Sequence, residues 1–188
     1  MKKLLALSLF SFLLFFGCNQ ESEITSSVNN SNNQQLKLIS LPQSSSGLSV
    51  ETLYTESMVI NGRYGAEFTA YFSYQGGPFG QVTVESELEF DSYSFQGTVE
   101  ITQTLDSEFT ALKFGPSMQF NKPVKLTFKF VGLDLSNVNP KTLDFVYIDA
   151  NGNMFPCDYD YIQMDASNGY IIVGNAQLNH FSRYGFVN

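Results

Sequence analysis

The chain has 188 residues, with ten Lys and Arg against 18 Asp and Glu and a formal net charge of −8 at pH 7. This acidity argues against nucleic acid or an anionic lipid surface as a partner, because like charges repel. Once a leader and a tether are set aside, about 140 residues remain, which is enough for one domain with a hydrophobic core.

The N-terminus has the layout of a secretory leader. Two lysines after Met1 precede residues 4–16, which are apolar except for two serines. As a helix this run would cover only about 20 Å, whereas a permanent membrane span needs about 20 residues. We therefore expect residues 1–17 to be a signal peptide that is removed.

The leader ends in Phe15-Phe16-Gly17-Cys18, which resembles the lipobox of bacterial lipoproteins. The resemblance implies cleavage before Cys18 and attachment of a diacylglyceryl group to its thiol. Two or more lipid chains anchor a protein stably, so the chain is expected at the bacterial cell envelope, held to a membrane by lipid. An ordinary secreted protein with a chance cysteine at this place is the alternative.

Lipidation of Cys18 would leave Cys157, the other cysteine, without a partner for an intramolecular disulfide. No basic residue lies near Cys157 in the sequence, so a small buried hydrophobic residue is favoured over a reactive thiol.

Residues 18–47 are predicted to be the lipidated cysteine and a flexible tether. Residues 19–35 consist mainly of Ser, Asn, Gln and Glu, show no periodicity, and cannot bury enough apolar surface to offset their ordering entropy. Residues 36–41 are either a first short strand or the apolar end of the tether.

Residues 48–188 are predicted to form an all-β domain, an antiparallel β-sandwich. Apolar and polar residues alternate clearly from Val82 to Asp91, again from Pro123 to Phe130, and also from Phe68 to Tyr74. The pairs Asn151-Gly152 and Asn168-Gly169 favour tight hairpin turns. Short strands separated by such turns are typical of a sandwich.

Two stretches resemble the ZU-five domain, a β-sandwich of scaffold and envelope proteins. Residues 114–116 (FGP) and 120–127 (FNKPVKLT) are similar to its centre, and residues 178–184 (LNHFSRY) to its end. The resemblance covers residues 65–188 and implies a ZU-five-like sandwich used for protein–protein contacts or spacing, which is an argument by analogy.

The alternation from Val82 to Asp91 places four acids on one face of a strand: Glu85, Glu87, Glu89 and Asp91. One interpretation is a site for a cation or a basic partner. The other, which we favour, is a solvated face balanced by Lys125 and Lys129 on a neighbouring strand.

Asp149, Asn151 and Asn153 resemble the start of a calcium loop, but Gly152 comes too early in it and a hairpin turn explains them better. A second calcium candidate is a set of three acids in a loop-rich region: Asp158, Asp160 and Asp165. No cofactor is expected.

The chain has one histidine, His180, and no G-x-S-x-G motif, so a non-enzymatic role is expected. That role would be interaction with an unknown envelope protein, or the role of a spacer. Glycan binding is the alternative, with an exposed Tyr71, Tyr93 or Tyr159 stacking on sugars.

Some relatives of the ZU-five family cut themselves between Phe and Ser, which suggests Phe181-Ser182 as a further alternative. The Ser182 hydroxyl would attack the preceding carbonyl with His180 as the base. We expect His180 and Ser182 instead to share one face of a closing strand, and we expect the chain to stay intact.

Overall fold

The structure is a computed structural model that describes residues 36–44 and 54–188. The expected signal peptide, Cys18 and residues 19–35 of the expected tether lie outside these ranges. The regular structure within them is entirely β, and no helix in this part of the chain could span a membrane.

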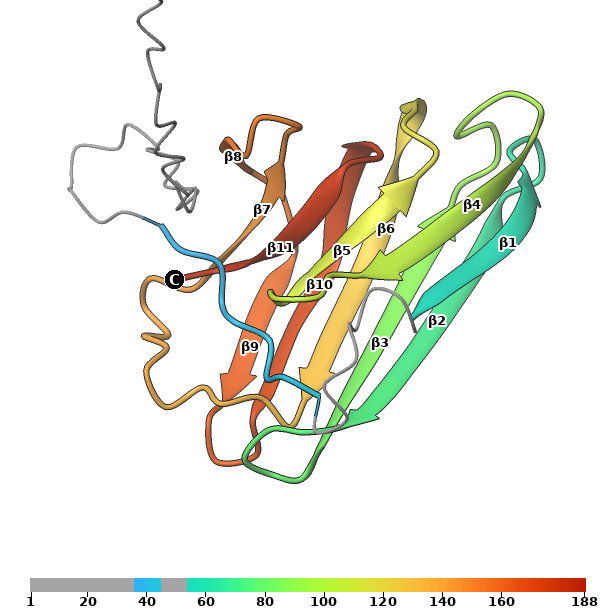
Figure 1. Ribbon diagram of the computed structural model, residues 1–188. Coiled ribbons are helices and arrows are strands. Elements are labelled where there is room, and N and C mark those ends of the chain that lie inside the picture. The colour runs from blue at the N-terminus through green and yellow to red at the C-terminus, as the bar shows by residue number, and fades with distance from the viewer. Residues whose placement is uncertain (1–35, 45–53) are drawn as a thin grey trace, which may run out of the picture.

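The eleven strands of the described residues form two antiparallel sheets that pack face to face, which confirms the predicted β-sandwich (Figure 1). The six-stranded sheet has the order β1-β4-β5-β11-β7-β8, and the five-stranded sheet has the order β2-β3-β6-β10-β9. The strand bounds are β1 Thr55–Asn61, β2 Ala66–Gln75, β3 Gln81–Phe90, β4 Thr98–Leu105, β5 Ala111–Gly115, β6 Gln119–Val131, β7 Asp144–Ile148, β8 Met154–Pro156, β9 Tyr161–Asp165, β10 Tyr170–His180 and β11 Arg183–Val187.

The predicted alternation produces the core. Val82, Val84, Leu88 and Phe90 of β3 are all buried, and the acids between them face outward. The inward faces of β2 and β6 are filled in the same way, and the centre is aromatic, with the Phe128 and Phe186 rings stacked 5.7 Å apart. A fully buried side chain of this kind stabilises the fold by about 1.5–3 kcal/mol.

Both Asn-Gly pairs lie in hairpin turns, as predicted. Asn151-Gly152 joins β7 to β8, and Asn168-Gly169 joins β9 to β10. The Asp149 carboxylate accepts hydrogen bonds from the backbone N–H groups of Asn151 and Asn153, at 2.8 Å each. The polar residues around Gly152 therefore build the turn, as the hairpin interpretation requires.

Residues 36–44 lie within the predicted tether (18–47), of which residues 36–41 could also be a first short strand, and in the structure they pack on the sandwich. Ile39 and Leu41 are buried in the core, and Leu38 forms a β-bridge with Val187. The backbone N–H of Lys37 donates to the carbonyl of Asn188, and the carbonyl of Lys37 accepts from the N–H of Asn188. This segment therefore runs beside the C-terminal end of β11 (Figure 1). Because these apolar side chains fill the core between the sheets, the packed domain includes residues 36–44 and does not begin at residue 48.

Candidate functional site

The outer surface of the five-stranded sheet carries most of the charged residues singled out in the sequence. We call it the acidic face, and we define it by six carboxylates and two lysines: Glu67, Glu85, Glu87, Glu89, Asp91, Asp160, Lys125 and Lys129. They come from β2, β3, β6 and the segments that follow β3 and precede β9.

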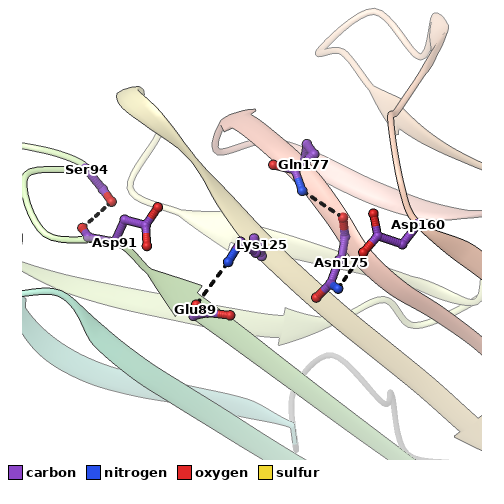
Figure 2. Close-up of polar contacts among 7 residues, drawn as sticks. All are labelled: Glu89, Asp91, Ser94, Lys125, Asp160, Asn175 and Gln177. Atoms are coloured by element: carbon purple, nitrogen blue, oxygen red, sulfur yellow. Dashed lines mark hydrogen bonds and ion pairs between the residues drawn. The ribbon is translucent and has the colours of Figure 1, made fainter.

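Two cross-strand ion pairs hold the centre of the acidic face. Lys125 lies opposite Glu89, with Nζ 3.0 Å from Oε1, and Lys129 lies opposite Glu85 and bonds to its carboxylate (Figure 2 shows the first pair). The hydrogen bond that Lys125 donates to Glu89 raises the pKa of Lys125, as do the negative charges of Glu89, Asp91 and Asp160. The predicted pairing of Lys125 and Lys129 with acids of β3 is confirmed.

The remaining carboxylates are not balanced in this way. Glu87 lies between Thr69 and Thr127 in the ladder, and Glu67 lies opposite Glu89, which has the same charge. Among residues 36–44 and 54–188, no Lys or Arg forms an ion pair with Glu67 or Glu87. Pairing with lysines therefore accounts for only some of the acids on the outer side of β3, and the acidic face as a whole carries a net negative charge.

A bulge in β10 shapes the other side of the acidic face. The register with β6 shifts between Val173 and Ala176, and Asn175 has a positive φ of 55°. Its Nδ2 donates to Asp160 Oδ2 at 2.7 Å, and its carbonyl accepts from Gln177 Nε2 at 3.0 Å (Figure 2). Bulges of this kind redirect side chains, and this one turns Asn175 toward Asp160.

The tyrosines proposed for sugar stacking differ in exposure. Tyr71 on β2 and Tyr93 are 60% and 59% exposed. Tyr159 is half-buried and donates its O–H to Asp144 Oδ1, and burial raises its pKa to about 12, so the expectation that it is exposed is wrong. Sequence reasoning missed Tyr161, whose ring lies over Gly174. A Cβ atom added to Gly174 would be only 2.2 Å from the ring of Tyr161, so only glycine leaves room for the ring.

The Phe181-Ser182 bond lies where the chain crosses from one sheet to the other. β10 ends at His180 and β11 begins at Arg183 in the opposite sheet, so the expected single closing strand is wrong. The Ser182 hydroxyl donates to the carbonyl of Ile148 at 2.7 Å, while the His180 ring packs edge-on against Tyr147. No hydrogen bond within the described part of the chain joins His180 to Ser182.

Cys157 is a buried free thiol, which agrees with the interpretation as a small hydrophobic residue. Its Sγ lies 3.7 Å and 3.6 Å from the carbonyl oxygens of Asp158 and Gln177. Burial, followed by the charge of Asp158, raises its pKa from 9.0 to about 12. The thiol is therefore protonated at neutral pH, which is the unreactive form.

The structure does not gather the three acids of the calcium candidate. Asp160 precedes β9 and bonds Asn175, whereas Asp165 ends β9, about 16 Å away at 3.3 Å per residue, and binds Ser167 and Asn168. Asp158 contributes its backbone carbonyl to Gln177. No group of three metal-ligating side chains occurs in the described ranges.

The chain was compared with protein-family models, with curated proteins and with solved structures, and none of the three comparisons found a match.

Proposed function

We propose that the chain is a lipid-anchored protein of the bacterial cell envelope that uses the acidic face to bind a basic partner protein, without catalysis. The observation that carries the proposal is the charge of this face, where six carboxylates are matched by two lysines. Complementary charge steers association and suppresses wrong partners. The ZU-five resemblance supports the same role by analogy.

The architecture suits such a contact. The face lies on a hydrogen-bonded sheet, so the backbone positions of its residues are fixed before a partner arrives, and such preorganisation lowers the cost of binding. Tyr71 and Tyr161 are exposed at 60% and 42%. Tyrosine is enriched at the centres of interfaces, so these two residues would supply apolar contact within an otherwise charged surface.

The anchor is tested first, with Cys18→Ala. If Cys18 carries the lipid, this variant leaves the membrane fraction and loses labelling by a fatty-acid analogue. Unchanged fractionation and labelling would refute the anchor and leave the binding proposal to be judged on its own.

The binding proposal is tested by charge reversal on the acidic face. In vivo cross-linking followed by capture should recover one specific protein with the wild type and lose it with Glu67→Lys combined with Glu87→Lys. The matched control is Glu56→Lys combined with Glu100→Lys, which reverses two exposed acids of the other sheet. Equal capture by both variants would contradict the role of the acidic face.

Glycan binding is the second candidate, because the Tyr161 ring covers Gly174 beside the Asp160–Asn175 pair. An aromatic ring next to a carboxylate and an amide can stack on a sugar and bind its hydroxyl groups. A glycan-array signal that Tyr161→Ala abolishes, while Tyr93→Ala preserves it, would favour this candidate over the first. The Phe181-Ser182 alternative gains no support, since the Ser182 proton is donated to Ile148.

A further inference from the structure

The outer surface of the six-stranded sheet contains a groove of about 600 Å³ that the proposed function does not use. The groove crosses β4, β5, β11 and the end of β7. The side chains that matter for its chemistry are Thr104, Asp106, Lys113, Ser117, Ser182 and Arg183. Leu105, Leu112 and Tyr184, which alternate with them along the strands, face the core.

Two cations lie side by side in the groove. Arg183 of β11 and Lys113 of β5 are directly opposite each other in the antiparallel ladder. Like charges in this position are destabilising, and the rest of the chain has an excess of acid. Such a pair therefore calls for an anion nearby.

Among residues 36–44 and 54–188, only one of the two cations has an anionic partner. Arg183 Nη2 lies 2.8 Å from Asp106 Oδ2, and the guanidinium lies 5.5 Å from the centre of the Phe109 ring. Lys113 is exposed and has no carboxylate within ion-pair distance among the described residues. Asp149 also lines the groove, but both of its oxygens accept hydrogen bonds inside its own turn, which lower its pKa.

Arg183 also has an unused donor. Its Nε is buried, and no acceptor for it exists in residues 36–44 and 54–188. Buried donors in folded proteins nearly always have a partner, so the hydrogen-bonding capacity of the Arg183 guanidinium is only partly satisfied by the described residues.

We infer that this groove binds a small ligand through a carboxylate group, which accepts hydrogen bonds from Lys113 and Arg183. The guanidinium fork matches the planar geometry of a carboxylate. A single negative charge also matches the single unbalanced lysine, whereas a phosphate dianion would be repelled by Asp106 and Asp149. The hydroxyl groups of Thr104, Ser117 and Ser182 are available to polar parts of the ligand.

The test is calorimetric titration of the full chain with four probes and inorganic phosphate. Glucuronate and N-acetylalanine carry the carboxylate, and glucose and N-acetylalanine amide are their uncharged counterparts. We expect at least one acid to bind and its counterpart not to. Binding of glucuronate alone identifies a sugar acid, and binding of N-acetylalanine alone identifies an amino-acid carboxylate. No binding of either acid, or tighter binding of phosphate, overturns the inference.

Lys113→Gln tests the site itself. Loss of a charge-assisted contact should weaken binding about tenfold or more. Lys141→Gln, which removes an exposed lysine outside the groove, should leave affinity unchanged. A thermal melt of both variants checks folding, and equal affinities for the two would overturn the assignment. The outcome is independent of the acidic face, which lies on the other sheet.

Discussion

At the scale of single residues, burial governs the chemistry of the titratable side chains in the core. Cys157 is the clearest case, because its pKa is raised to about 12 by its surroundings. Tyr74 and Tyr184 are shifted in the same direction by burial. Each of these groups is held in its neutral form, so each disfavours the folded state once the pH is high enough to ionise it in the unfolded chain.

Cys157 should therefore make stability fall with rising pH. Its contribution is fully present below its ordinary pKa of 9.0 and is lost progressively as the pH rises toward about 12. Chemical denaturation at a series of pH values should show this decline starting near the ordinary value. Cys157→Ala should reduce the decline between roughly pH 9 and 10, before the tyrosines contribute. An identical pH profile in the variant would contradict this account.

Substitutions of Asn175 test whether the left-handed backbone conformation at this position restricts which residue it can hold. Its φ of 55° lies in the left-handed region, which Asn and Gly tolerate and other residues adopt at a cost of about 1–2 kcal/mol. Asn175→Ala should lower the free energy of unfolding by about that amount, and Asn175→Gly should lower it less. The exposed bond to Asp160 is lost in both variants, so it cancels in the comparison. The opposite order of stability would refute the conformational explanation.

At the scale of strands, the alternation of apolar and polar residues predicted which side chains are buried, but it did not predict how the strands are divided between the two sheets. The buried and exposed faces of β2, β3 and β6 follow directly from their period of two. The alternation breaks near residues 180–184, where the polar residues Ser182 and Arg183 are adjacent, but the break alone does not reveal that the chain changes sheets at Phe181 and Ser182. Alternation says which side a residue faces, but it does not say to which sheet the residue belongs.

The two candidate surfaces were likewise predictable only where their residues are close together in the sequence. Glu85, Glu87 and Glu89 could be placed on one face because they are neighbours in the sequence. Glu67 and Asp160 join them only through the order of strands in the sheet. The pair of Lys113 and Arg183 depends on the register of β5 against β11, which are separated by three other elements of the other sheet and by β7 and β8. A single sequence does not contain that information.

A substitution in residues 36–44 tests whether this segment belongs to the packed domain. Leu41 is 3% exposed and its N–H donates to the carbonyl of Glu108. Leu41→Ala should lower the free energy of unfolding by about 2–5 kcal/mol, the usual cost of removing a buried leucine. Lys37→Ala, which changes an exposed residue of the same segment, should lower the free energy of unfolding only slightly. A negligible effect of Leu41→Ala in denaturant titration would restore the tether boundary expected from composition.

At the scale of the whole molecule, the two outer surfaces offer different binding chemistry. The five-stranded sheet has the acidic face, on which Lys125 and Lys129 are paired, and the six-stranded sheet has a groove whose Lys113 has no ion-pair partner among the described residues. A basic protein and a small acid could therefore bind at the same time, each on its own sheet. This separation makes the two proposals independently testable.

The way the N-terminal segment enters the domain has a mechanical consequence. Lys37 and Ile39 are hydrogen-bonded to Asn188 and Phe186 in an antiparallel arrangement at the very end of the chain. If Cys18 is held in a membrane, a pull on the bound domain reaches it along residues 36–44. The bonds to β11 and the buried Ile39 and Leu41 would then share the load, so residues 36–44 and β11 together would resist extraction of the domain under force.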